Sequence, residues 1–189
     1  AFMGGELDFM HGTIEAKKVG AKRIGDAVKR YGENSPVPIA LHLDHGKNFD
    51  SCKAAIEGGY TSVMIDGSKL DFEANIAETK RVADVAKALD IPCEAELGKV
   101  GGKEDDLEAE ADTNTDPQEA KEFVERTGCD SLAVAVGNVH GVYSAEPKIR
   151  FDIIEEVHKE VSVPLVLHGA SGICLLYTSD AADDLTRVD

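Results

Sequence analysis

Short apolar runs alternate with longer amphipathic segments along this chain. The apolar runs are rich in Val, Ile and Leu and are nearly continuous, which is typical of parallel strands buried on both faces. We predict five such strands, at residues 37–43, 61–65, 91–97, 131–136 and 163–167. Helical patterns fall between them and include residues 50–57, 72–89 and 117–126. The alternation of strand and helix predicts an α/β protein.

Two of the predicted helices carry clear signals. In residues 72–89, apolar side chains such as Ile76 and Val82 recur at spacings of three and four with charged residues between them, so one face packs and the other is solvated. The helix at residues 117–126 has a well-marked start, because residues 115–116 (TD) supply a cap-like polar residue and Pro117 suits the first helical position.

Five parallel strands with intervening helices fit either a doubly wound sheet or a (β/α)8 barrel, and periodicity does not distinguish the two. Polar residues follow or end four of the predicted strands: His45, Glu96, His140 and His168. A barrel gathers functional residues from the ends of several strands, whereas an open sheet concentrates them at one switch point. We therefore expect an incomplete (β/α)8 TIM barrel, with about five of its eight strands present.

Composition limits the function classes. The 189 residues suffice for one sizeable core, and no Pro-rich or Ser-rich linker divides them. With 20 basic and 36 acidic side chains the net charge is -16, which opposes non-specific binding to nucleic acid. A phosphorylated small molecule is compatible with that charge, because helix N-termini can hold phosphate locally. Since no apolar run is long enough to cross a bilayer and no signal pattern is present, we expect a cytoplasmic protein without a membrane partner.

Histidine followed by glycine occurs three times near the ends of predicted strands. The three histidines are His45, His140 and His168. Imidazole is the commonest zinc ligand, and catalytic zinc takes three protein ligands and leaves one position open for substrate. A single histidine of this kind would more often be a hydrogen-bonded structural group. The repetition therefore indicates a metal site, provided that the strands lie side by side.

Six sequence runs occur here in the same order as in a known family. They are residues 42–46 (HLDHG), 62–68 (SVMIDGS), 94–98 (EAELG), 101–105 (GGKED), 137–141 (GNVHG) and 168–172 (HGASG). With these runs the chain resembles the class II, metal-dependent fructose-bisphosphate aldolases, including the tagatose-bisphosphate aldolases, over residues 1 to about 173. One run alone would be a weak signal, but a chance match to all six in order is implausible.

The resemblance implies a metal centre and a reaction. His45, His140 and His168 match the ligands of a catalytic zinc ion, and Glu96 matches a position that can bind the metal in an alternative location. Glu96 could equally be a buried carboxylate that orients a ligand. The implied reaction is reversible aldol cleavage of fructose 1,6-bisphosphate to dihydroxyacetone phosphate and glyceraldehyde 3-phosphate through a zinc-stabilised enediolate.

The resemblance also assigns the proton transfers that an aldol reaction needs. Glu104 matches the base that removes the carbon-bound proton, and Asp44 matches the acid that protonates the aldehyde oxygen. Asp44 also adjoins His45 in sequence and so lies within reach of a metal-bound group, although it could instead orient the histidine. Glu104 stands in residues 101–106, which we predict to be a mobile loop that carries the base inward. That acidic run could also merely solvate the loop.

Three further residues, Gly141, Gly169 and Ser171, match positions that hold a substrate phosphate through backbone groups and a hydroxyl. Glycine permits such close approach, although a plain tight turn would favour glycine too. Main-chain atoms near Val139, Gly141 and Gly169 match the family's monovalent-cation site. The resemblance thus implies a second divalent ion and a monovalent cation besides the catalytic zinc.

The family pattern predicts that this chain is a fragment truncated at both ends. It begins after the second family strand and lacks the eighth, and residues 174–189 match no family run, so we interpret them as a non-native tail. The partial barrel then comprises residues 1–173. Exposed edges of a parallel sheet tend to pair with other chains, so we expect the fragment alone to fold poorly. The family habit implies that the parent protein is a homodimer or a larger assembly.

Three other functions fit the same residues. Tagatose 1,6-bisphosphate differs from the fructose compound at one stereocentre, which these motifs do not reveal. A zinc-dependent hydrolase barrel would use the same histidines to activate water. An inactive metal-binding fragment would hold zinc without chemistry, in which case substitution of Asp44 or Glu104 would change only stability.

Overall fold

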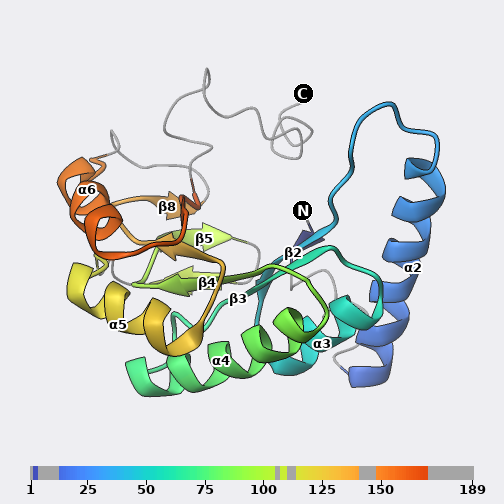
Figure 1. The fold of residues 1–189 in the computed structure, drawn as a ribbon, viewed down its shortest axis with the longest axis horizontal. Helices are drawn as coiled ribbons and strands as arrows, with labels where there is room; N and C mark the ends of the chain where they lie inside the picture. The colour runs from blue at the N-terminus through green and yellow to red at the C-terminus, as the bar shows by residue number, and fades with distance from the viewer. Residues whose placement is uncertain (1, 4–12, 105–106, 110–113, 141–147, 170–189) are drawn as a thin grey trace. The chain divides into compact units, whose positions relative to one another are not determined.

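The computed structural model describes residues 2–3, 13–104, 107–109, 114–140 and 148–169 (Figure 1). Contacts divide the chain into two compact units. The first unit contains residues 1–96 and 125–131, and the second contains residues 97–124 and 132–189. Each unit contains parallel strands and helices that connect them.

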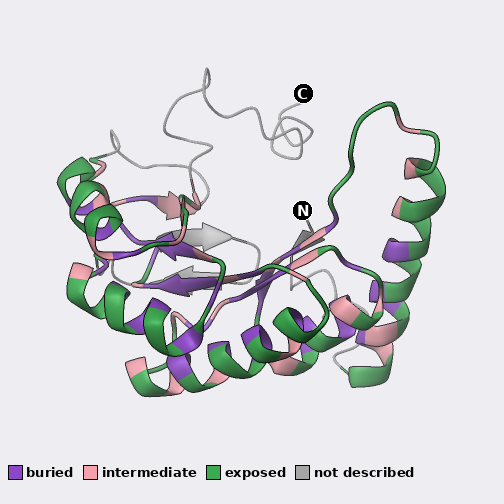
Figure 2. Ribbon diagram, viewed as in Figure 1, coloured by how far each residue is buried: buried purple, intermediate pink, exposed green. Residues whose placement is uncertain are grey.

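A parallel sheet forms the centre of the first unit. Its strands are paired in the order β1 (Phe2–Met3), β2 (His42–Gly46), β3 (Ser62–Ile65) and β4 (Cys93–Leu97). The connecting helices are α2 (Ile14–Gly32), α3 (Phe49–Glu57) and α4 (Phe72–Ala88). Leu43, Val63 and Cys93 are paired in register across three strands and each is 0% exposed, so they form the middle of the core. Figure 2 shows the buried residues concentrated in these strands, while the helices are exposed on their outer faces.

Each of the three helices begins at a side-chain cap. Thr13, Asn48 and Asp71 accept a hydrogen bond from the backbone N–H three residues further on, at 3.2, 3.0 and 2.9 Å. Such caps satisfy one of the N–H groups that the first turn leaves without a helical partner. They therefore fix where each helix starts after the preceding strand.

The first predicted strand is wrong in position. The sequence pattern places it at residues 37–43, but β2 begins at His42. Pro38 has no N–H group to contribute to a strand ladder, and Val37 and Ile39 are 63% and 50% exposed. Pairing with β3 carries the strand on to Gly46 instead.

Helix α2 is not among the helices that we predict from the pattern. Its buried residues are Lys17, Gly20, Ala21 and Gly25, so its packed face lacks the large apolar side chains that produce a recognisable stripe. A Cβ atom at Gly25 would collide with the carbonyl oxygen of Gly58. Small residues thus let the backbone of α2 pack directly against the end of α3.

The second unit contains shorter strands. Its strands are β5 (Gly101–Glu104), β6 (Leu107–Ala109), β7 (Ser131–Val134), β8 (Val139–His140) and β9 (Leu165–Val166). Its helices are α5 (Pro117–Thr127), which starts as predicted after Asp116, and α6 (Phe151–Glu160). Strands β7 and β9 are parallel, while β5 pairs parallel with β8 and antiparallel with β6.

The predicted loop at residues 101–106 is wrong, because residues 101–104 form β5. Gly101 pairs with Val139 and Gly102 with His140, and β6 pairs on the other edge. Glycine and acidic residues have low strand propensity, but two neighbouring strands supply the backbone partners that propensity does not. Glu104 therefore stands at the end of a strand.

Parallel pairings link β1 to β2, β2 to β3, β3 to β4 and β7 to β9, and a helix lies between the two strands of each pair in the sequence, which confirms the predicted α/β class. None of the described helices is long and apolar enough to span a bilayer. The partial barrel over residues 1–173 stays a prediction, and the predicted tail, residues 174–189, lies outside the described residues.

Candidate metal site

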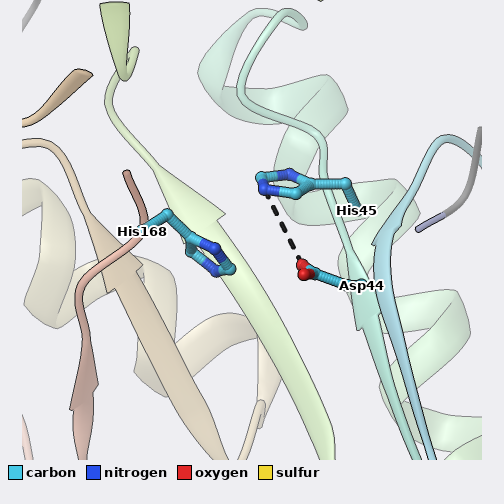
Figure 3. A group of neighbouring side chains, drawn as sticks. All are labelled: Asp44, His45 and His168. Atoms are coloured by element: carbon cyan, nitrogen blue, oxygen red, sulfur yellow. Dashed lines mark ion pairs between the residues drawn. The ribbon is translucent and has the colours of Figure 1, made fainter. Parts of the chain in front are cut away.

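Carboxylates surround the imidazole of His45 at the carboxyl ends of three neighbouring strands of the first unit. His45 is 2% exposed. Its Nδ1 atom lies 3.0 Å from Oδ2 of Asp66, which directly follows β3, and 3.6 Å from Oε2 of Glu96 on β4. Its Nε2 atom lies 3.7 Å from Oδ1 of Asp44 (Figure 3). The structure thus brings together three of the predicted site residues, His45, Asp44 and Glu96, and adds Asp66.

The backbone of His45 has an unusual conformation for a residue with a side chain. Its φ angle is 46°, in the left-handed region. The ladder between β2 and β3 shifts register between Leu43 and Gly46, and the N–H of His45 donates to Sδ of Met64 at 3.3 Å. A left-handed residue of this kind costs on the order of 1–3 kcal/mol and persists only where its surroundings impose it. Strain of this sort is concentrated at functional sites.

Asp66 is itself held in place. Its Oδ1 atom accepts hydrogen bonds from the backbone N–H of Ser68 at 3.0 Å and from the Ser68 hydroxyl at 2.6 Å. Burial raises the pKa of Asp66, but the bonds from His45 and Ser68 outweigh burial and lower the pKa to about 2. The carboxylate is therefore ionised and accepts the Nδ1 proton of His45. A proton fixed on Nδ1 leaves Nε2 as the metal-binding nitrogen.

The same carboxylates change the protonation of His45. Burial lowers the pKa of the imidazole, but Asp66, Glu96 and Asp44 outweigh it and raise the pKa to about 9. At neutral pH the metal-free ring therefore carries a positive charge. The carboxylates that hold this proton on His45 also attract other cations.

The donor set fits a divalent metal ion. His45, Asp66 and Glu96 each offer one ligand atom, and these atoms all lie within 4.8 Å of one another. One imidazole and two carboxylates suit zinc and other divalent ions of its row. Sequence reasoning missed Asp66, although the rule that identified Glu96, a polar residue at the carboxyl end of a strand, applies equally to it.

Asn75 holds the strand that carries Glu96. The Asn75 amide donates from Nδ2 to the carbonyl oxygen of Glu96 at 2.9 Å, and its Oδ1 atom accepts from the Thr79 hydroxyl at 3.1 Å. Asn75 and Thr79 are both buried on α4. The carboxyl end of β4 is thereby tied to the helix beside it.

In the second unit, His140 and His168 lie close together. Their ring centroids are 6.1 Å apart and the ring planes are inclined by 41°. His140 ends β8, and His168 lies two residues beyond β9. Gly169 has a φ angle of 66°, and a Cβ atom there would collide with the carbonyl oxygen of Val139. Two of the three histidines predicted to bind zinc are thus neighbours, while the complete three-histidine centre stays a prediction.

The other predicted site residues are placed only in part. Glu104 is the last residue of β5, in the strand whose Gly102 is paired with His140. Gly141 and Ser171 lie outside the described residues. Their roles as a base and as phosphate ligands stay predictions.

The comparisons with known sequences agree on one protein family. A sequence model of the family described as fructose-bisphosphate aldolase class-II matches residues 6–181. The fructose-bisphosphate aldolase of Staphylococcus aureus is 51% identical over 140 residues, which are 74% of this chain and 49% of that protein. The fructose-bisphosphate aldolase of Geobacillus stearothermophilus is 49% identical over 156 residues, which are 82% of this chain and 54% of that protein.

A solved structure is similar as well. The crystal structure of the YdjI aldolase from Escherichia coli K12 matches with a TM-score of 0.70 at 45% identity, over 81% of this chain and 53% of that chain. The chain therefore spans about half the length of the curated relatives it matches.

Proposed function

Since this chain belongs to the class II fructose-bisphosphate aldolase family, we propose that it serves the reversible cleavage of fructose 1,6-bisphosphate. The products are dihydroxyacetone phosphate and glyceraldehyde 3-phosphate. The observation that carries the proposal is the family match over residues 6–181, which includes the buried, carboxylate-lined His45. A phosphorylated sugar is accordingly the substrate.

We assign the catalytic zinc ion to His45, His140 and His168. A zinc ion bound there supplies Lewis-acid polarisation of the substrate carbonyl. Asp66 holds Nδ1 of His45 and so directs Nε2 to the metal position. Glu96 lies on the Nδ1 side of the same ring, which supports its assignment as a ligand of a second divalent position.

Two carboxylates move the protons. In cleavage, the C4 hydroxyl loses its proton as the C3–C4 bond breaks, and C3 gains a proton to complete dihydroxyacetone phosphate. We assign the first transfer to Asp44, whose Oδ1 atom lies 3.7 Å from Nε2 of His45 and hence beside the proposed metal position. We assign the second transfer to Glu104, at the end of β5. In the synthetic direction the two residues exchange acid and base roles.

The remaining assignments concern the phosphate, the ions and the surroundings. Gly141, Gly169 and Ser171 hold a substrate phosphate, and main-chain atoms of Val139, Gly141 and Gly169 hold a monovalent cation. The close approach of the Gly169 backbone to Val139 supports a site made of main-chain atoms. We further propose that the protein works in the cytoplasm. We also propose that it forms a homodimer or a larger assembly, and light scattering of the purified protein will measure its oligomeric state.

The test is a coupled assay of triose phosphate release from fructose 1,6-bisphosphate. It is run on this chain and on a chimera in which the chain replaces the aligned segment of the Staphylococcus aureus relative. Treatment with EDTA should abolish cleavage, and added zinc should restore it. Cleavage that resists EDTA after the metal has been shown to be removed would refute the metal-dependent assignment.

Matched variants separate chemistry from stability. Asp44→Asn should lower kcat by about 10²–10⁴-fold, the usual contribution of a positioned acid or base. Asp84→Asn, at an exposed aspartate on α4 whose Oδ1 atom lies 2.9 Å from Nζ of Lys80, should leave kcat unchanged. If both variants keep full activity, Asp44 does not take the proton of the C4 hydroxyl. If zinc is bound but tagatose 1,6-bisphosphate alone is cleaved, the fructose assignment is wrong.

A further inference from the structure

Asn138 is a fully buried polar residue for which the aldolase reaction assigns no role. It lies between β7 and β8 in the second unit and is 0% exposed. Its Oδ1 atom accepts a hydrogen bond from the backbone N–H of Val136 at 2.8 Å. Its Nδ2 atom donates to the carbonyl oxygen of His168 at 2.8 Å and to that of Val134 at 3.4 Å. A single amide therefore joins the end of β7 to His168, two residues beyond β9.

These hydrogen bonds make a rigid link. A buried amide whose donors and acceptor are all satisfied fixes the groups around it, because breaking any one bond leaves a polar atom in a dry interior. The bonds to Val134 and Val136 hold the turn after β7. The bond to His168 reaches across 30 positions of sequence and is the one that joins two separate elements.

The linked elements carry the two neighbouring histidines. His140 lies two residues after Asn138 on β8, and the carbonyl group that Asn138 holds belongs to His168 itself. On the other side of the same junction, Gly169 packs its backbone against Val139 so closely that no Cβ atom would fit. The two rings, whose centroids are 6.1 Å apart, thus project from backbone segments that are in contact at this junction.

We infer that Asn138 is a positioning residue that sets the spacing and inclination of His140 and His168 as a pair of metal ligands. It acts through their backbones and touches neither the substrate nor the metal. The inference rests on the proposed function, because it takes both histidines to be zinc ligands. A metal ion tolerates little error in ligand distance, so loss of this link should appear first in metal affinity.

The decisive variant is Asn138→Asp, which is nearly isosteric. Its carboxylate can still accept from Val136, but it cannot donate to the carbonyl oxygens of His168 and Val134. We expect zinc affinity, measured by competition with a chromophoric chelator, to fall about 10–100-fold, as it does when groups that orient metal ligands are removed. The visible spectrum of the Co²⁺-substituted protein should change as well, because it reports ligand geometry. Asn138→Ala should show the same two effects.

Thr115→Val is the matched control in the same unit. Thr115 is 2% exposed, its hydroxyl donates to the carbonyl oxygen of Leu97 at 2.6 Å and it accepts from the N–H of Ala135 at 2.9 Å. Its loss should lower the thermal unfolding temperature by an amount similar to that for Asn138→Asp. Zinc affinity and the Co²⁺ spectrum should stay as they are in the unsubstituted protein.

A metal-free measurement keeps the inference separate from the proposed function. In the unsubstituted, chelator-treated protein, nuclear Overhauser effects should connect ring protons of His140 and His168, and Asn138→Asp should weaken them while folded amide signals persist. Unchanged ring contacts, or zinc affinity and Co²⁺ spectra equal to those of the unsubstituted protein, would overturn the inference. Failure to cleave fructose 1,6-bisphosphate despite intact ring contacts and zinc binding would instead refute only the proposed function.

Discussion

The two oxygens of Asp66 have separate tasks: Oδ2 holds Nδ1 of His45 at 3.0 Å, while Oδ1 is held by Ser68. The imidazole of His45 is therefore oriented by the carboxylate of Asp66, which Ser68 holds in place. A metal ligand gains basicity and a fixed tautomer from such a partner. The relationship makes Asp66 the residue on which the behaviour of His45 depends most directly.

Replacing Asp66 by Asn tests this dependence. The amide oxygen can still accept the Nδ1 proton, so the substitution removes the negative charge while preserving the shape. We expect the pKa of His45 to fall from about 9 toward its ordinary value, because the first of the groups that raise it is lost. Zinc affinity should fall about 10–100-fold. A histidine titration by NMR and a zinc titration measure the two effects.

Asp26→Asn is the control for this substitution. Asp26 is an exposed aspartate on α2 whose Oδ2 atom lies 2.8 Å from Nζ of Lys22. It should change neither the titration of His45 nor zinc affinity. If Asp66→Asn behaves in the same way as Asp26→Asn, then Asp66 does not govern the imidazole.

The raised pKa of His45 predicts how stability depends on pH in the metal-free protein. The pKa in the folded protein is about 9, above the model-peptide value of 6.5. The folded state therefore holds a proton that the unfolded state releases. The resulting stabilisation is complete below about pH 6.5 and is lost as the pH rises through about 9. Its size is on the order of 3 kcal/mol.

Urea unfolding of the chelated protein between pH 6 and pH 10 measures this loss. The unfolding free energy should decrease between about pH 6.5 and pH 9 and level off above that range, and Asp66→Asn should flatten the decrease. A stability that does not decrease between about pH 6.5 and pH 9 would mean that His45 is neutral in the folded protein.

The sequence predicts the strands that consist of continuous apolar runs. The runs at residues 61–65 and 131–136 contain β3 and β7, and the predicted α/β class and family resemblance are confirmed. The similarity to a solved aldolase structure agrees with the predicted α/β fold class. The apolar pattern does not predict helix α2, because small residues and a lysine form its buried face. Strand β5 could not be predicted from the apolar pattern because its residues are polar or glycine and its parallel partner β8 lies far away in sequence.

The candidate site likewise contains some residues that the sequence identifies and others that only the structure identifies. His45 and Glu96 could be found by residue type and by their place at the end of a strand. Asp66 satisfies the same rule, but only the 3.0 Å contact reveals that it serves His45. The bond from Asn138 to His168 depends on which turns meet across the second unit, and one sequence does not contain that information.

Gly169 provides a prediction about backbone conformation. Its φ angle is 66°, and a Cβ atom would collide with the carbonyl oxygen of Val139. Gly169→Ala should therefore combine left-handed strain with a displacement of the neighbouring backbone. We expect a loss of stability greater than the roughly 1 kcal/mol of the conformational cost alone, and weaker zinc binding because His168 adjoins the displaced residue.

Gly128 is the matched control, because its φ angle is 68° but a Cβ atom there would have nothing within 4 Å. Gly128→Ala should show the conformational cost, about 1 kcal/mol, and unaltered zinc affinity. Thermal unfolding and zinc titration of the two variants isolate the effect of the collision. Equal losses in both would mean that the backbone at Val139 yields freely.

Metal binding at His45 should release a proton. With a pKa of about 9, the metal-free ring is protonated at neutral pH, whereas a metal ion needs the lone pair of Nε2. Zinc affinity should therefore rise about tenfold per pH unit between roughly pH 7 and pH 9 and level off above that range. Calorimetric titration in two buffers of different ionisation enthalpy counts the protons released on zinc binding. Asp66→Asn should reduce that number at pH 8, because the imidazole of His45 is already largely neutral in this variant. Equal binding enthalpies in both buffers would show that zinc binds without displacing a proton from His45.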